Sequence, residues 1–171
     1  MPLIKSVNGI KPVFGVNCYL AENATIVGDV VAGNDCSIWF NAVVRGDVNS
    51  IRIGNKVNIQ DGAVVHCTYQ KTITTIGNNV SIGHNAIVHG CNVSDNVLIG
   101  MGAIVMDNCN IGENSIIAAG AVLVENTVVP PGTVWAGIPA KKIKDINPEL
   151  QKGEIDRIAN NYLMYAGWFK Q

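Results

Sequence analysis

With 171 residues, 12 of them basic and 13 acidic, the chain is long enough for one domain with a buried core and too balanced in charge to attract nucleic acid or an anionic membrane. No segment reaches the about 18 consecutive apolar residues of a membrane helix. The N-terminal stretch lacks the apolar run of a signal peptide and the five cysteines lack CxxC spacing, so we expect reduced thiols in a cytoplasmic protein.

An aliphatic residue recurs every six positions through most of the chain, and a small side chain follows most of these residues four positions later. A period of six fits one face of a triangular coil, in which three hexads, about 18 residues, form one turn. The sequence therefore predicts an all-β solenoid, a parallel β-helix, over residues 1–140; a β-sandwich with Gly-rich turns is the alternative. The aliphatic positions expected to point inward are Leu20, Ile26, Ala32, Ile38, Val44, Ile53, Ile59, Val65, Ile76, Ile82, Val88, Val93, Ile99, Val105, Ile111, Ile117, Leu123 and Val129.

The six-residue register breaks twice, between Val44 and Ile53 and between Val65 and Ile76. Each break adds residues to the repeat. Insertions in a solenoid usually leave at a corner, so we expect two protruding loops.

A different pattern follows the repeat. Residues 148–170 place apolar side chains three and four positions apart, which predicts an amphipathic C-terminal α-helix. Gly153 weakens its first turns. We expect this helix to lie along one face of the prism or against a neighbouring subunit.

The chain has three histidines, and the hexad count places them. Arg45, His66 and His89 each follow an inward aliphatic by one position on the same face, so they point outward on successive coils. Asp61 and His84 follow inward residues by two positions on another face. In a single chain, His84 is therefore around a corner from the other two histidines.

His66 and His89 are expected to lie close enough to share one metal ion. If three prisms pack as a closed trimer, His84 of one subunit completes the set with the pair of the next. Three neutral imidazoles with an open fourth position are typical of a catalytic zinc site, and Fe²⁺ or Co²⁺ accepts the same ligands. The alternative for any one of these histidines is simple exposure to solvent.

Three segments resemble the γ-class carbonic anhydrases, a family of hexapeptide-repeat proteins. These segments are VVRGD (43–47), NIQDGAVVH (58–66) and IGHNAIVHG (82–90). The resemblance implies a left-handed β-helix, a homotrimer, and zinc or iron bound by His66, His84 and His89. It also implies the reversible hydration of carbon dioxide to bicarbonate by hydroxide generated at the metal.

The same resemblance implies roles for further residues. Arg45 would pair across the subunit interface with an aspartate, for which Asp61 is the candidate, and Asp47 would lie nearby. For Arg45 and Asp47, a purely structural role in holding the trimer together is the alternative. Gln60 would orient the hydroxide by a hydrogen bond, with help from Asn58.

The loops of this chain bear on its activity. The best-studied type of the family carries glutamates on two acidic loops, one of them a proton shuttle, whereas the corresponding segments GDVNSIR and CTYQKTITT contain none. Slow or buffer-dependent turnover would follow.

Tyr162 resembles an active-site tyrosine of the family, and a position in the core is the alternative. Cys67 is expected to pack rather than to bind metal.

Two other functions fit the repeat. A hexapeptide acyltransferase would use an acyl-coenzyme A and one histidine as general base, without a metal. A metal-stabilised trimer without catalysis would act as a scaffold or binding module. The stacked pair His66 and His89 argues against the acyltransferase, because a general base does not need a second imidazole one coil away.

Overall fold

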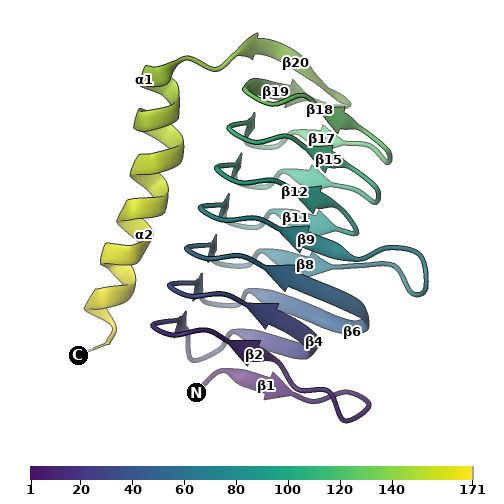
Figure 1. The fold of residues 1–171 in the computed structure, drawn as a ribbon, viewed down its shortest axis with the longest axis vertical. Helices are drawn as coiled ribbons and strands as arrows, with labels where there is room; N and C mark the ends of the chain where they lie inside the picture. Colours follow the sequence, from purple (N-terminus) through teal and green to yellow (C-terminus); the bar gives the residue numbers. More distant parts are fainter. Residues whose placement is uncertain (171) are drawn as a thin grey trace.

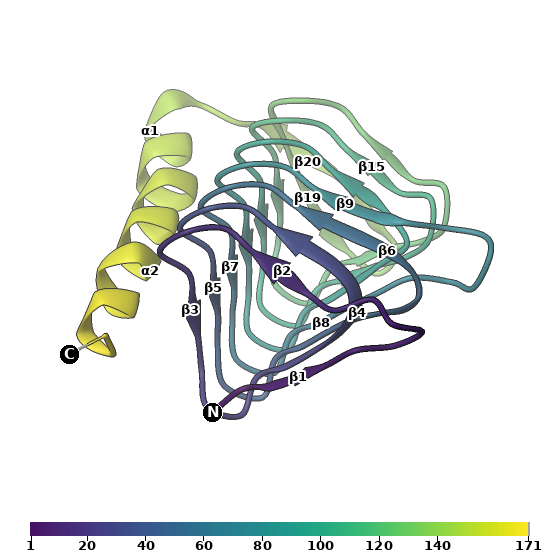
Figure 2. The ribbon, with the colours of Figure 1, turned by 60° about the horizontal axis from the view of Figure 1, so that its bottom comes forward.

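The computed structural model describes residues 1–170, which form a triangular parallel β-helix with one helical segment along its side (Figures 1 and 2). Each coil contributes a short strand to each of three faces, and strands of successive coils pair in parallel. The predicted fold class, an all-β solenoid with a C-terminal helix, is confirmed.

The three faces are built from the following strands. Face one carries β1 (Leu3–Lys5), the first parts of β4 (Thr25–Ala32) and β6 (Val43–Ile53), β8 (Val64–His66), β11 (Ile87–His89), β14 (Ile104–Val105) and β17 (Val122–Leu123). Face two carries β2 (Val13–Phe14), the second parts of β4 and β6, β9 (Thr74–Ile76), β12 (Asn92–Val93), β15 (Asn110–Ile111) and β18 (Val128–Val129). Face three carries β3 (Tyr19–Leu20), β5 (Ser37–Ile38), β7 (Asn58–Ile59), β10 (Ser81–Ile82), β13 (Leu98–Ile99), β16 (Ile116–Ile117), β19 (Thr133–Gly137) and, antiparallel to β19, β20 (Ala140–Asp145).

The recurring aliphatic side chains fill the prism. All of those from Ile26 to Val129 are buried, and only Leu20, on the first coil, is partly exposed. Asparagines with positive φ turn many corners, for example Asn79 and Asn96, which are also joined by a side-chain hydrogen bond of 2.9 Å. Asparagine tolerates this backbone conformation better than most residues, so the asparagines of the repeat allow the chain to turn sharply between faces.

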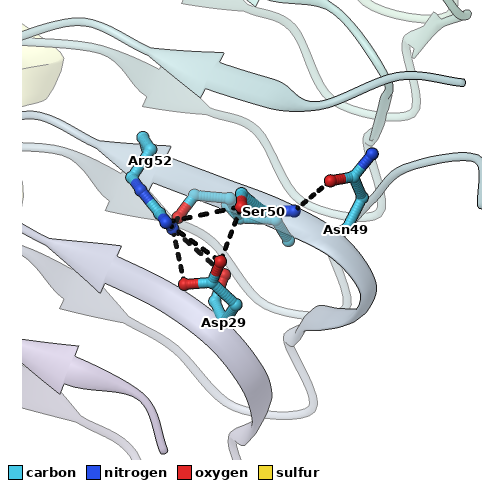
Figure 3. A network of polar contacts seen from close by, with 5 residues as sticks. Asp29, Asn49, Ser50 and Arg52 are labelled. Atoms are coloured by element: carbon cyan, nitrogen blue, oxygen red, sulfur yellow. Dashed lines mark hydrogen bonds and ion pairs between the residues drawn. The ribbon is translucent and has the colours of Figure 1, made fainter. Parts of the chain in front are cut away.

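The first break in the period does not form the loop that the sequence predicts. β6 runs without interruption from face one to face two and pairs with β4 on both sides of a bulge. Figure 3 shows the polar network at this corner: the two terminal nitrogens of Arg52 donate to the Asp29 carboxylate at 2.8 and 2.9 Å, and Ser50 Oγ donates to it at 2.6 Å. These contacts absorb the extra residues into a bent strand. Only the second break forms a protruding loop, residues 67–73 between β8 and β9 (Figure 1).

We expect Asp29→Asn to lower the free energy of unfolding by about 1–2 kcal/mol at pH 7, because it removes a charge-assisted network. Hydrogen bonds from Arg52 and then Ser50 hold the pKa of Asp29 below its usual range. This stabilisation is therefore fully present above the pKa of Asp29 in the unfolded chain, about 4. It is lost as the pH falls through the lower pKa of Asp29 in the folded protein.

Urea unfolding at pH 7 and at pH 3 measures this effect. The difference between wild type and Asp29→Asn should shrink at the lower pH. Asp145→Asn is a control, because it breaks only the exposed ion pair with Lys142 and should change little at either pH. A difference for Asp29→Asn that is constant with pH would contradict the assignment.

The helical segment packs along face three, one of the two positions expected for it (Figure 2). It consists of α1 (Pro148–Leu150), a π-helical stretch η1 (Gln151–Asp156) and α2 (Arg157–Trp168). Gly153, expected to weaken the first turns, lies in the π-helical stretch. Ile155 is 1% exposed and packs against Leu98 and Ile116 of face three. No helix within residues 1–170 has the length and hydropathy to cross a membrane.

Candidate metal centre

Two of the three histidines stack on face one, as the hexad count predicts. His66 ends β8, His89 ends β11, and the two residues are direct partners in the parallel register. The side chains are 16% and 31% exposed. His66 Nδ1 lies 3.1 Å from His89 Nε2, so the two rings converge through one nitrogen each.

The second nitrogen of each ring contacts an aspartate. His66 Nε2 lies 3.1 Å from Asp47 Oδ1, and His89 Nδ1 lies 2.5 Å from Asp107 Oδ1. Arg45 pairs with the other oxygen of Asp47. Burial alone would raise the pKa of each aspartate, but the hydrogen bonds outweigh it and hold both pKa values below the usual range. Both carboxylates are therefore ionised at neutral pH.

These carboxylates determine where the ring protons lie. An ionised carboxylate can only accept a hydrogen bond, so each histidine carries its proton on the nitrogen that faces its aspartate. His66 Nδ1 and His89 Nε2 then present lone pairs to each other, which a cation would stabilise. Two nitrogens bound to one tetrahedral zinc at about 2.0–2.1 Å lie about 3.3–3.4 Å apart, close to the observed separation. Burial also lowers the pKa of His66, which favours the neutral imidazole that a metal requires.

The third histidine lies on face three, beneath the helix. His84 Nδ1 is 2.9 Å from Asp61 Oδ2, and His84 Nε2 is 3.2 Å from the hydroxyl of Tyr162. The Tyr162 ring packs edge-on against Trp39, with 5.2 Å between centroids. Burial raises the pKa of Tyr162 to about 12, so its hydroxyl stays protonated at neutral pH. Tyr162 thus packs against the core and also contacts a predicted metal ligand.

Two buried amides lie beside this histidine on face three. Gln60 Nε2 donates to Asn58 Oδ1 at 2.9 Å, and Asn58 Nδ2 donates to Ser81 Oγ at 2.7 Å. This chain fixes the orientation of Gln60, and its carbonyl oxygen remains to accept a hydrogen bond from water. Gln60, His84 and Tyr162 line a cavity of about 390 Å³ whose other walls are largely apolar.

A single chain does not bring all the predicted ligands together. Within residues 1–170, no three His, Cys, Asp or Glu side chains are placed to hold one metal ion. Arg45 pairs with Asp47, while Asp61 contacts His84, so the predicted pairing of Arg45 with Asp61 across an interface stays a prediction. Cys67 is fully buried, as expected for a packing residue.

Comparison with known proteins identifies the family. A model of the bacterial transferase hexapeptide (six repeats) matches residues 90–124, and this repeat fits a left-handed β-helix. The chain is 52% identical over 150 residues to a protein of Methanocaldococcus jannaschii named probable carbonic anhydrase, covering 88% of this chain and 91% of that one. It is 38% identical over 161 residues to gamma carbonic anhydrase 2, mitochondrial, of Arabidopsis thaliana, covering 91% and 58%. The chain belongs to the γ-carbonic anhydrase family.

A solved structure shares the fold under a different functional name. The hexapeptide transferase family protein of Anaplasma phagocytophilum superposes with a TM-score of 0.92 at 38% identity, covering 98% of each chain. The same fold can carry unrelated reactions, so fold alone does not separate a γ-carbonic anhydrase from an acyltransferase. The residues of the site must do so.

The sequence interpretation missed two residues of the face-one site, Asp107 and Thr68. Asp107 contacts His89, and Thr68 Oγ1 donates to Asp107 Oδ2 at 2.5 Å. Val88 pairs with Val105, so the coil count could have placed Asp107 on the adjacent coil, one position beyond the neighbour of His89. Thr68 gave no such signal, because it lies in the loop that interrupts the period.

Proposed function

We propose that the chain is a metal-dependent carbonic anhydrase that interconverts carbon dioxide and bicarbonate at the subunit interfaces of a homotrimer. The observation that carries this proposal is the pair of ring nitrogens of His66 and His89, which converge while aspartates hold the opposite nitrogens. The names of the relatives support a lyase of this type.

A trimer is proposed because one chain supplies only two convergent ligands. His84 lies on face three, around a corner from the pair on face one. If face three of one subunit meets face one of the next, His84 joins the pair of its neighbour, and closed symmetry repeats the site three times. The apolar side chains beside the pair on face one support such an interface, because Ile87 and Met106 are each 36% exposed.

His66 through Nδ1, His89 through Nε2 and His84 through Nε2 would hold the metal. For His84, Asp61 accepts the hydrogen bond from Nδ1, so Nε2, which faces the Tyr162 hydroxyl in the single chain, is the nitrogen that would bind the metal. Zinc is commonly bound by three imidazoles, and Fe²⁺ or Co²⁺ would fit the same set. When bound, the metal supplies hydroxide near neutral pH by lowering the pKa of water, as is known for carbonic anhydrases in general.

Gln60 and Tyr162 would orient the reactants beside His84. Since the amide nitrogen of Gln60 donates to Asn58, the Gln60 carbonyl oxygen can accept a hydrogen bond from the attacking group and fix its direction. The apolar part of the adjacent cavity would offer carbon dioxide a hydrophobic surface beside His84. Arg45 keeps Asp47 ionised, and Asp47 in turn holds the proton of His66.

Proton release is the step for which this chain lacks a loop glutamate. Residues 46–52 and 67–75 contain none, so we expect buffer molecules to carry the proton to solvent. Turnover should then rise with buffer concentration over a wide range.

Elemental analysis of protein purified without air or chelator, followed by stopped-flow hydration of carbon dioxide, tests the proposal. We expect about one metal ion per chain, and a hydration rate that disappears with chelation and returns with Zn²⁺ or, anaerobically, Fe²⁺. Varying the buffer concentration tests the proton step.

The outcomes separate the other candidate functions. A metal-free protein that transfers acetyl groups from acetyl-coenzyme A would favour the acyltransferase. A stoichiometric metal with no hydration under any buffer would favour a structural trimer. Either result would overturn the proposed function.

A further inference from the structure

Asp107 lies between a predicted metal ligand and the protruding loop. Its Oδ1 accepts from His89 Nδ1 at 2.5 Å, and its Oδ2 accepts from Thr68 Oγ1 at 2.5 Å. The Asp107 side chain is 16% exposed. The carboxylate thus links the corner after β14, where Asp107 lies, to the loop after β8 and to the end of β11.

We infer that Asp107 is a positioning residue that keeps the ring proton of His89 on Nδ1 and so leaves Nε2 free to bind the metal, with Thr68 holding the carboxylate in place. The inference rests on the proposed function for the role of the metal. It gives the loop of residues 67–73 a purpose other than proton transfer.

The loop is built to hold this carboxylate. Thr68 N donates to Thr72 Oγ1 at 2.9 Å, which closes the loop on itself. Gly90, directly after His89, has a φ of 54°, and a β-carbon there would lie 2.1 Å from Asp107 Oδ1 and 2.3 Å from Thr72 Oγ1. The carboxylate therefore occupies space that only a glycine leaves open, beside the ring it contacts.

A comparison with Asp95 indicates that this contact is not a general property of the corners. Asp95 and Asp107 both lie two positions after an inward valine and directly before an asparagine with positive φ. The Asp95 carboxylate accepts from the backbone and side chain of Asn78, at 2.7 and 3.2 Å, which serves the stacking of the coils. The Asp107 carboxylate instead faces the side chains of Thr68 and His89.

The geometry also predicts what an amide would do in this position. An asparagine at position 107 can donate to His89 Nδ1, which moves the ring proton to Nε2, the nitrogen that faces His66. Replacing such an outer partner of a metal-ligating histidine typically weakens metal binding about 10- to 100-fold. Since the side chain lies outside the prism core, the fold should survive.

The test combines Zn²⁺ affinity with the protonation pattern of the metal-free protein. Zn²⁺ dissociation constants are measured by competition with a chromophoric chelator for wild type, Asp107→Asn, Thr68→Val and Thr68→Ser. Asp95→Asn is the matched control. Nitrogen-15 spectra of selectively labelled histidine report which ring nitrogen is protonated, and three histidines give a resolvable spectrum. Circular dichroism confirms that each variant is folded.

For Asp107→Asn, we expect the Zn²⁺ dissociation constant to rise about 10- to 100-fold and the His89 proton to move toward Nε2. Thr68→Val should shift both readouts in the same direction to a smaller extent, while Thr68→Ser and Asp95→Asn should match wild type. Unchanged affinity and an unchanged His89 signal in Asp107→Asn would overturn the inference. If wild type bound no Zn²⁺, the proposed function would fail, and the His89 signal would still decide whether Asp107 positions the ring.

Discussion

His89→Ala should remain folded and lose its bound metal. The variant leaves His66 Nδ1 without its neighbour at 3.1 Å, so each site retains at most two imidazoles. The loss of a ligand should weaken metal binding by more than the about 100-fold seen for outer partners, and hydration activity should fall with the metal content. Because His89 points outward, the buried aliphatic residues are untouched.

Elemental analysis, thermal unfolding and analytical ultracentrifugation of His89→Ala test these points together. Ser94→Ala is a suitable control, because Ser94 follows an inward valine by one position on face two, as His89 does on face one. The control should keep the metal. Stoichiometric, tightly bound metal in His89→Ala would remove this residue from the site.

The second large effect should appear when two inactive variants are mixed. One carries His84→Ala, and the other carries both His66→Ala and His89→Ala. Neither alone has a complete set of ligands in any arrangement. In a mixed trimer, one interface joins an intact pair from the first variant to an intact His84 from the second, so we expect one complete site per mixed trimer.

Co-expression of the two variants with different affinity tags allows the mixed trimers to be isolated. If equal amounts assemble at random, about three-quarters of the trimers are mixed, and the total metal is about a quarter of the wild-type content. Hydration activity should recover in the same proportion. No recovery in purified mixed trimers would mean that the ligands do not come from two subunits.

The architecture could be predicted because its cause is repeated many times. Inward aliphatic residues every six positions leave few alternatives, and a single exception such as Leu20 changes nothing. The stacking of His66 on His89 follows from the same count, since side chains one position after an inward residue point outward in register. The position of His84 around a corner follows in the same way.

The remaining features depend on contacts that a period does not encode. The unbroken course of β6 is set by Asp29 and Arg52, which lie 23 residues apart and pair only once the coils are stacked. The π-helical stretch around Gly153 reflects how the helix must fit face three. Asp107 could have been found by counting one coil from His89 and looking one position further, whereas Thr68 could not, because the loop breaks the count.

The C-terminal end of the prism is the edge at which another chain could add strands. A parallel coil leaves its last strand with unpaired backbone groups that can recruit another chain. Here β20 turns back against β19, and five of its six residues are exposed, including Lys141, Lys142 and Lys144. A charged antiparallel edge is a poor template for further parallel strands. On face three, the last edge of the solenoid therefore offers a further chain a charged antiparallel strand and not an open parallel one.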